Sequence, residues 1–409
     1  MTQAASSPNS PSPPGADVVV IGAGAIGASA AFHAARAGAS VILIDREPDV
    51  ASGTTAQSSS IVRTHYSVAA NVQLAQQSLA AFTAFREYTG DADAECGLNL
   101  CGYLIVGADD ARGRAIDAAM RAQREMGIEA RMIDAASARE ILPLLETAGL
   151  AHFGYEPGAG YADAYMTAAS FARAARRLGA RALMSTRVRS LRVEGARVVG
   201  VDTSAGPVSA GAVIVAANVW SAPLLAPLLA PSGAALGLVA ERHEVIALEA
   251  PEPYLPHYPV FKDISGASML YARCYGRTQL LASPGLPGTP ADPDEGQVDV
   301  SLDFVAGLGE QVAARLPVFA EAGLASSWTG LYDVTPDWNP VLGALPGVQG
   351  LTVAYGFSGH GFKLSPAVGR LLAGHALGAP ETALLEPYRF ERFARGRLLR
   401  GAYGAGAVS

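Results

Sequence analysis

The chain is poor in the residues that build disulfide frameworks and nucleic-acid-binding surfaces. It has three cysteines in 409 residues, which cannot all pair with one another, and their spacing matches no metal-ligand pattern. A reducing cytoplasm is the simplest compartment for such a chain. Only 16% of the residues are charged, the net charge is −7, and Lys and Arg form no stripe, so we expect no nucleic-acid partner. Half of the residues are hydrophobic, which excludes a disordered chain.

Long uninterrupted hydrophobic runs are also missing. The most apolar stretch, residues 211–230, is interrupted by Asn218, Pro223 and Pro227. We therefore expect a buried core strand and loop there, and no membrane span. Residues 1–15 are rich in Ser, Pro and Ala and lack the basic start and apolar core of a signal peptide, so they predict a disordered tail.

A short apolar run, residues 17–21, leads into a G-x-G-x-x-G sequence. Residues 28–37 are alanine-rich and predict a helix that ends at Gly38, and residues 41–44 predict a second buried strand that ends at Asp45. Two strands, a helix and an acid in this order are typical of a dinucleotide-binding βαβ unit.

Each glycine of this unit, and the acid that follows it, meets a physical requirement of dinucleotide binding. Gly22 allows the tight turn, Gly24 lets a pyrophosphate approach the backbone, and Gly27 lets the helix and strand pack closely. Asp45 follows Gly22 by 23 residues, where an acid accepts hydrogen bonds from ribose hydroxyls.

Hydroxyl and amide side chains dominate residues 52–60, which predicts a loop that hydrogen-bonds a ligand or caps a helix. Helical patterns follow at 71–88, 109–127, 163–178 and 299–315, and strand patterns at 100–107, 182–217, 241–249, 268–282 and 351–355.

The last of these strands delivers the chain into a glycine-rich loop, Gly356–Lys363. Ser365 is a good N-cap and Pro366 suits a first helical position, so we expect a helix from Pro366 to Leu377. A helix N-terminus carries free amides and partial positive charge, so an electron-rich group is expected there.

A βαβ unit mixed with hairpin-rich segments predicts a mixed α/β (α+β) fold. We expect a Rossmann-type dinucleotide-binding domain interrupted by a second, largely antiparallel domain. The first domain is expected to comprise residues 16–90, 156–240 and 326–400. The second is expected to comprise residues 91–155 and 241–325.

Together these residues resemble the family of FAD-dependent amino-acid and amine oxidases that includes D-amino-acid, glycine and sarcosine oxidases. The resemblance spans about residues 16–395 and is closest to sarcosine oxidase-like members. Its four strongest segments are the glycine-rich βαβ turn, the Ser/Thr loop running to residues 61–63, Gly330–Asp337 and Gly356–Lys363.

The resemblance implies FAD as the bound dinucleotide and oxidation of a carbon–nitrogen bond. It implies that Arg63 and Lys363 hold a substrate carboxylate, that Tyr332 lines the substrate pocket, and that His360 faces the flavin. The same resemblance, with the βαβ pattern, gives the expected FAD contacts: Gly22, Gly24, Ala25, Ile26, Gly27, Asp45, Arg46, Thr54, Thr55, Ser58, Ser59, Ser60, Val188, Ala217, Trp220, Gly330, Gly359, His360, Gly361, Phe362 and Lys363.

Two departures from the family pattern matter. Some relatives attach FAD covalently through a cysteine or a histidine, where this chain has Gly330 and the pair Ala56-Gln57, so we expect noncovalent FAD. The lysine with which sarcosine oxidases activate oxygen corresponds to the region 271–282, which contains Arg273 and Arg277 but no lysine.

The sequence thus predicts a cytoplasmic FAD-dependent oxidase of a small amino acid or N-alkyl amino acid, without a metal. Oxygen would reoxidise the flavin to give hydrogen peroxide, and the imine product would hydrolyse. A dehydrogenase that passes electrons to another acceptor, alone or as a subunit of a larger complex, stays open as an alternative; a homo-oligomer is the other assembly we consider. A flavin protein without amine chemistry and an NAD(P)-linked dehydrogenase are the competing classes.

Overall fold

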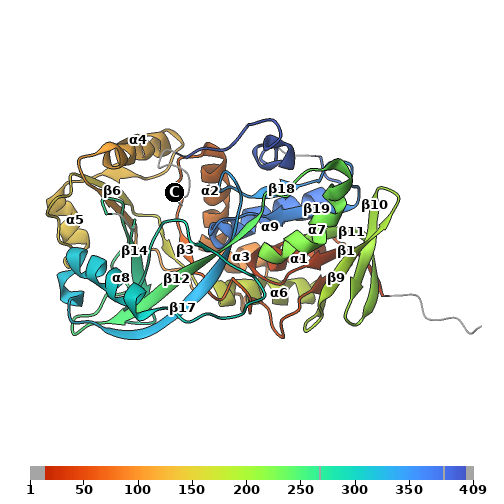
Figure 1. Cartoon of the computed structure of the whole chain (residues 1–409), viewed down its shortest axis with the longest axis horizontal. Coiled ribbons are helices and arrows are strands. Elements are labelled where there is room, and N and C mark those ends of the chain that lie inside the picture. Colours follow the sequence, from red (N-terminus) through yellow and green to blue (C-terminus); the bar gives the residue numbers. More distant parts are fainter. Residues whose placement is uncertain (1–13, 267–268, 381–382, 402–409) are drawn as a thin grey trace, which may run out of the picture.

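A computed structural model describes residues 14–266, 269–380 and 383–401. Residues 1–13 of the predicted tail lie outside this range, while Gly15 is already the first residue of a strand. The chain forms two large sheets, one toward each end of the molecule in Figure 1, with helices packed on both.

The first sheet contains the βαβ unit. Its strands run in the order β18 (Val341–Gly343), β19 (Leu351–Tyr355), β11 (Gly206–Val215), β1 (Gly15–Ile21), β2 (Val41–Ile44) and β8 (Arg181–Leu183). From β19 to β8 every neighbouring pair is parallel. A hairpin of β9 (Val188–Glu194) and β10 (Arg197–Thr203) extends from β11 in antiparallel pairing.

Alternate side chains of this sheet enter two separate cores, because successive residues of a strand point to opposite faces. Val18 and Val20 pack with α1 (Ala25–Arg36), α6 (Ala164–Arg177) and α9 (Gly361–Ala376). On the opposite face, Val19 and Ile21 pack with residues of α7 (Ser221–Leu229).

Helix α1 is rich in alanine, which has the highest helix propensity and leaves room for close neighbours. Every residue from Ala25 to Ala35 is buried. A side chain at Gly369 of α9 would collide with Ser29, since its Cβ would lie 2.2 Å from the Ser29 hydroxyl. The small residues therefore allow α9 to lie directly against α1.

The second sheet is largely antiparallel. Its order is β16 (Thr289–Pro290), β12 (Val239–Glu249), β15 (Gln279–Ser283), β14 (Tyr271–Tyr275), β13 (Val260–Asp263), β4 (Tyr103–Gly107), β6 (His152–Glu156) and β5 (Arg131–Met132). β17 (Gly323–Val334) pairs with β12 along its length. The two sheets confirm the predicted fold class.

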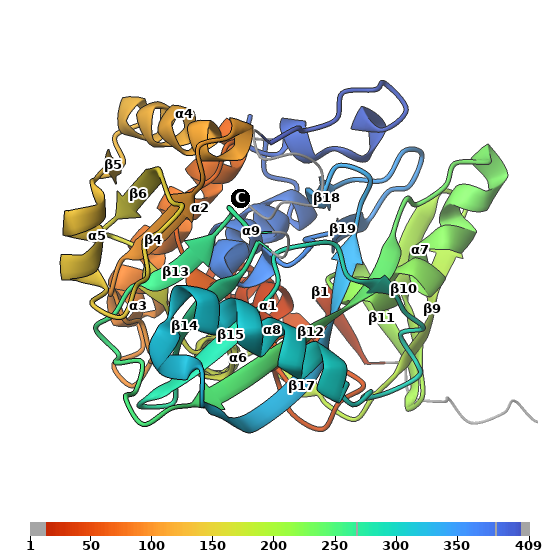
Figure 2. The ribbon, with the colours of Figure 1, turned by 60° about the vertical axis from the view of Figure 1, so that its left-hand side comes forward.

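Three helices pack beside the second sheet, and several shorter elements complete the fold. Helices α4 (Ala111–Glu125), α5 (Ala135–Ile141) and α8 (Leu302–Arg315) lie on the side of the second sheet, as Figure 2 shows. The remaining elements are α2 (Ala69–Thr83), α3 (Phe85–Thr89) and the small sheet of β3 (Ile61–Val62) with β7 (Gly160–Tyr161). Residues 323–334 belong to the second sheet, beyond the expected limit at 325; the division into domains stays a prediction.

Two local predictions were wrong. Helix α9 begins at Gly361, so Pro366 lies inside it and Ser365 is not its N-cap. The free amides of the first turn are consequently those of the glycine loop itself. Residues 221–229 form α7 and not a loop, although Pro227 lies within that helix. In the described residues, no helix is both long and apolar enough to cross a membrane.

Candidate functional site

Three connected cavities run from the first sheet to the second. The dinucleotide cleft, about 410 Å³, lies where β1 and β2 end, at Ile21 and Ile44. The middle cavity, about 120 Å³, shares Thr54 and Thr55 with it. The inner cavity, about 40 Å³, shares Tyr332 and other residues with the middle one. Ligands of open parallel sheets bind at such carboxyl ends.

The glycine turn at the start of the dinucleotide cleft depends on missing side chains. Gly22 has φ +101°, and a Cβ there would lie 2.3 Å from the Ala216 carbonyl oxygen. A Cβ on Gly27 would lie 1.8 Å from the Gly22 carbonyl oxygen. Gly24 precedes α1 as its N-cap, without a side-chain cap. The absence of side chains at this turn therefore leaves backbone space for a pyrophosphate beside the N-terminus of α1.

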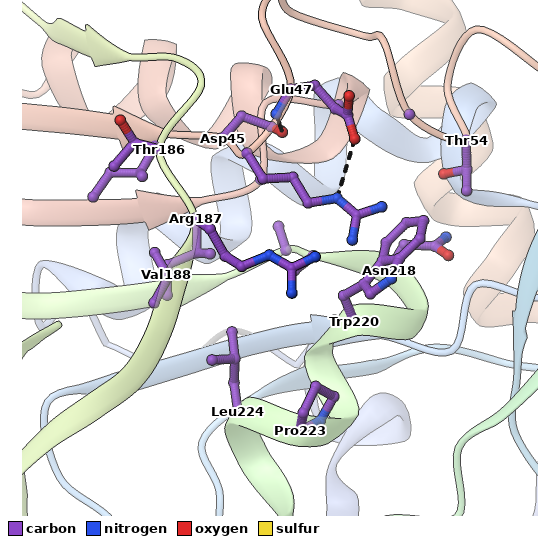
Figure 3. A pocket seen from close by; sticks show the side chains of 18 of the residues that line it. Asp45, Glu47, Thr54, Thr186, Arg187, Val188, Asn218, Trp220, Pro223 and Leu224 are labelled. Carbon is purple, nitrogen blue, oxygen red and sulfur yellow. Dashed lines mark hydrogen bonds and ion pairs between the residues drawn. The ribbon is translucent and has the colours of Figure 1, made fainter. Parts of the chain in front are cut away.

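Asp45 ends β2 on the wall of this cleft, with Thr54 and Trp220 on other walls, as Figure 3 shows. Its carboxylate accepts hydrogen bonds from the amides of Ala23, at 2.5 Å, and Glu47, at 2.9 Å. These two bonds fix the carboxylate between the glycine turn and the loop after β2.

Arg46 covers the outer part of the cleft. Its guanidinium lies 3.9 Å from the ring centroid of Trp220, and it pairs with Asp294 at 3.3 Å. The Trp220 indole also donates to Asp294 at 3.1 Å. Val188 and Ala217, two of the expected FAD contacts, line the same cleft.

The Ser/Thr loop, residues 52–60, joins the cleft to the middle cavity. The Thr55 hydroxyl accepts a hydrogen bond from the Ala25 amide at 3.1 Å, so this loop contacts the start of α1. Ser58 and Ser59 line the middle cavity. Ser60 is buried and its amide donates to the Ser58 hydroxyl, so it supports the loop and does not line any of the three cavities.

The glycine loop Gly356–Lys363 is held by a buried carboxylate that the sequence did not single out. Asp333 accepts from the amides of Gly356, at 2.6 Å, and Phe357, at 3.1 Å. Burial raises the pKa of Asp333 to about 6, although these bonds act in the opposite direction. Gly359 has φ +84°, and a Cβ there would lie 2.4 Å from the Tyr332 ring. The loop thus packs directly on Tyr332.

Arg63 and Lys363 meet in the inner cavity, although 300 residues separate them. Both are buried, with 4% and 7% exposure. The Arg63 guanidinium donates to the His65 carbonyl and lies 4.6 Å from the Tyr66 ring centroid. Burial, together with the charge of Arg63, holds the pKa of Lys363 well below its ordinary value. Tyr332 lines the same cavity.

The structure adds two residues that sequence reasoning missed. His243 stacks on Tyr332 at a centroid distance of 3.8 Å, and burial lowers the His243 pKa to about 4, so the ring is neutral. Lys262, on β13, is 3% exposed and lines the inner cavity. A lysine within a short apolar strand, in a chain with hardly any lysine, was the signal that could have found it.

The two arginines of the region 271–282 do not line the inner cavity. Arg273 donates from Nε to the Ser59 carbonyl at 2.5 Å and so supports the Ser/Thr loop. Arg277 is exposed in the turn between β14 and β15. Lys262 reaches the cavity from the neighbouring strand, where it is paired with Tyr271.

His360 is the one expected catalytic side chain that does not line the cavities. It is the N-cap residue of α9, and its ring packs 5.3 Å from that of Tyr66. Both ring nitrogens are buried without a hydrogen-bond partner. Burial and then the charges of Lys363 and Arg63 hold its pKa well below the ordinary value, so the ring is neutral. The remaining expected contacts of the middle cavity line it: Gly24, Ala25, Ile26, Gly330, Gly359, Gly361 and Phe362.

The arrangement fits FAD. The glycine turn leaves backbone space for a pyrophosphate, and Asp45 lies where a ribose would reach it. At the other end, the uncapped N-terminus of α9 faces the middle cavity through Gly361 and Phe362. Its amides suit the negative charge that a flavin ring acquires on reduction. The inner cavity adjoins this end, next to where the reactive ring would lie.

Replacing Gly22 by alanine should weaken FAD binding by about tenfold or more, because the new Cβ forces the turn away from Ala216. Gly38→Ala is the matched control. Gly38 also has positive φ, +88°, but a Cβ there meets nothing within 4 Å. Titration of the apoprotein with FAD, followed by flavin fluorescence, measures both variants. Equal affinities for the two variants would contradict the assigned role of the turn.

Comparisons with known proteins agree with this site. Residues 17–375 match the family described as DAO, FAD dependent oxidoreductase. The chain is similar to the FAD-dependent oxidoreductase domain-containing protein 1 of Bos taurus, with 28% identity over 93% of this chain and 85% of the relative.

Two solved structures are also similar. L-proline dehydrogenase from P. horikoshii has 25% identity, covers 94% of this chain and 100% of its own, and has a TM-score of 0.85. Glycine oxidase from Geobacillus kaustophilus has 27% identity, covers 92% and 99%, and has a TM-score of 0.80. The predicted cofactor is thereby confirmed as FAD and not NAD(P), and the chain belongs to the DAO family of FAD-dependent oxidoreductases.

Proposed function

We propose that this FAD-dependent oxidoreductase oxidises the C–N bond of a small amino acid or N-alkyl amino acid. The observation that carries the proposal is the meeting of Arg63 and Lys363 in one small buried cavity beside the FAD site. The similar solved structures include a proline dehydrogenase and a glycine oxidase, which supports an amino-acid substrate.

The inner cavity is built to hold a carboxylate. Arg63 offers a planar fork of donors, and its position is fixed by the His65 carbonyl and the Tyr66 ring. Lys363 adds a point charge from the first turn of α9. No acidic side chain is among the described residues that line this cavity. An anionic ligand would therefore relieve repulsion between cations that are already buried.

The same residues favour the reactive form of the substrate. Nearby cations lower the pKa of a bound ammonium group, so the amine loses its proton more readily. A neutral amine can donate electron density as the adjacent C–H bond breaks. When bound, FAD supplies the two-electron acceptor for the hydride. Tyr332, stacked on His243, forms one wall and limits how the substrate lies.

We propose noncovalent FAD and oxygen as the electron acceptor. Gly330 stands where some relatives carry a linking cysteine, and it faces Gln57, whose Cβ lies 3.3 Å from the position of a Gly330 Cβ. Neither residue offers a nucleophile for attachment. A dehydrogenase that passes electrons to another acceptor, alone or as a subunit of a complex, is the alternative.

An anaerobic spectral titration tests the proposal. We expect the purified protein to be yellow, to release its FAD on denaturation, and to bleach when one class of amino acid from a panel of sarcosine, proline, glycine and D-amino acids is added. Rapid recolouring in air with formation of hydrogen peroxide would establish an oxidase, whereas slow recolouring would favour the dehydrogenase. A yellow protein that none of these compounds bleaches would count against amine oxidation.

A further inference from the structure

The chain contains only two lysines, Lys262 and Lys363, among its 30 lysine and arginine residues. Both are buried, and both line the inner cavity. Everywhere else the chain uses arginine as its cation. The inner cavity is thus the one place where a compact, strongly hydrated ammonium group replaces the larger guanidinium.

Lys262 lies on a face of β13 that is otherwise apolar. Its strand neighbour Val260 belongs to a core cluster with Tyr103 and Ile105 of β4. The Lys262 ammonium lies 5.6 Å from the Tyr271 ring centroid. Burying an ammonium among such residues carries a large desolvation cost unless an anion accompanies it.

The acid next to Lys262 in the sequence raises the pKa of this lysine through its charge but forms no hydrogen bond or ion pair with it. Asp263 points to the opposite face, because adjacent strand residues alternate. There it pairs with Arg315 at 2.6 Å and accepts from the Ser265 hydroxyl at 2.5 Å. Lys262 therefore faces the cavity without a hydrogen-bonded partner among the described residues, and its charge adds to those of Arg63 and Lys363.

We propose that the substrate carries a second carboxylate and that Lys262 binds it, while Arg63 and Lys363 hold the first. The substrate class would be a small dicarboxylic amino or imino acid. This inference rests on the proposed function, and it names the substrate class of that same cavity.

The shape of the site supports a compact diacid. A Cβ on Gly285 would lie 2.0 Å from the Lys262 ammonium nitrogen, so the missing side chain gives this lysine its room. The cavity is small, about 40 Å³, so a long chain between the two carboxylates is excluded. Burial lowers the pKa of Lys262 to about 7, with Arg63 adding to the decrease, so an arriving carboxylate would restore the full charge.

The test uses two ligands that differ by one carboxylate and contain no C–N bond. Methoxyacetate carries one carboxylate, and oxydiacetate carries two around the same ether oxygen. Binding of each to the FAD-loaded protein is followed by the change in the flavin absorption spectrum. We expect oxydiacetate to bind about tenfold or more tighter than methoxyacetate, as one charged hydrogen bond would provide.

Lys262→Met should bring the two affinities to within about threefold of each other by weakening only the diacid. Lys363→Met should weaken both ligands, and Arg112→Met, at an exposed position on α4, should weaken neither. A wild-type protein that binds both ligands equally, or a Lys262→Met variant that keeps the diacid preference, would overturn the proposal.

A second measurement does not depend on the variants. Protein labelled with ¹³C at the lysine Cε positions should show two side-chain signals, because there are two lysines. We expect oxydiacetate to raise the pKa measured at Lys262 more than methoxyacetate does; an equal shift with the two ligands, or no shift with oxydiacetate, would refute the contact. The groups that share the cavity lining with Lys262 in this titration are Arg63, Lys363, Tyr103, Tyr271, Tyr332 and His243, and His65 and Asp263 lie close enough to interact with it electrostatically.

The second-carboxylate site and the amine oxidation can be refuted separately. If amino acids bleach the flavin but N-(carboxymethyl)glycine is no better than sarcosine, and the diacid ligand binds no tighter, the second carboxylate is wrong and amine oxidation stands. If the diacid ligand binds through Lys262 but no amine bleaches the flavin, the proposed function is wrong and the anion site stands.

Discussion

Replacing Lys363 by alanine should raise KM for the amino-acid substrate by about 10²-fold, and Arg63→Ala should do the same. Each change removes a charged hydrogen bond to the substrate carboxylate, which corresponds to about 3 kcal/mol in a buried site. Because the carboxylate is bound before and during the reaction, we expect a larger effect on KM than on kcat. Steady-state kinetics with an amino acid that bleaches the flavin measure both constants.

The control for this pair is Arg277→Ala. Arg277 lies in the turn between β14 and β15, is exposed and does not line any of the three cavities. Its loss should leave KM within about twofold, since exposed charges contribute little at close range. An unchanged KM in both the Arg63 and the Lys363 variants would refute the carboxylate clamp. Retention of yellow FAD by each variant shows that the fold has survived.

Breaking the buried ion pair between Asp337 and Arg392 should destabilise the protein by about 3–5 kcal/mol. The side chains are 1% and 4% exposed, and Arg392 donates to the Asp337 carboxylate from Nε at 2.7 Å and from Nη2 at 2.8 Å. Asp337 also accepts from the amides of Asn339 and Leu399. Arg392→Met would leave this carboxylate buried without its cation, which carries the full desolvation cost.

Urea unfolding, followed by flavin fluorescence and circular dichroism, measures the loss. The matched control is Arg114→Met, which removes an ion pair with Asp109 whose side chains are 61% and 81% exposed. That change should alter the free energy of unfolding by less than about 0.5 kcal/mol. If both variants unfold at the same urea concentration as the wild type, the buried pair does not hold the C-terminal segment in place.

Part of the site was predictable because its chemistry is local. The glycine turn, the alanine-rich helix and Asp45 lie within 24 residues, and their conformations follow from missing side chains and strand–helix alternation. Asp337 acts locally as well, because its carboxylate accepts from the Asn339 amide and so fixes the turn before Pro340. The start of α9 was misplaced because Pro366 resembles a first helical residue, whereas the helix had already begun at Gly361.

The sequence alone determined the FAD-binding architecture, the mixed α/β fold class and the Arg63 and Lys363 candidates. The tertiary structure decided which other groups share their cavity. Lys262 reaches it because β13 pairs with the nearby β14 on one side and, across more than 150 residues, with β4 on the other. Asp333 and His243 likewise acquire their roles only when β17 pairs with β12 and the glycine loop folds over them. Long-range strand pairing leaves no local pattern in the sequence, so the charge of the inner cavity could be read only from the folded chain.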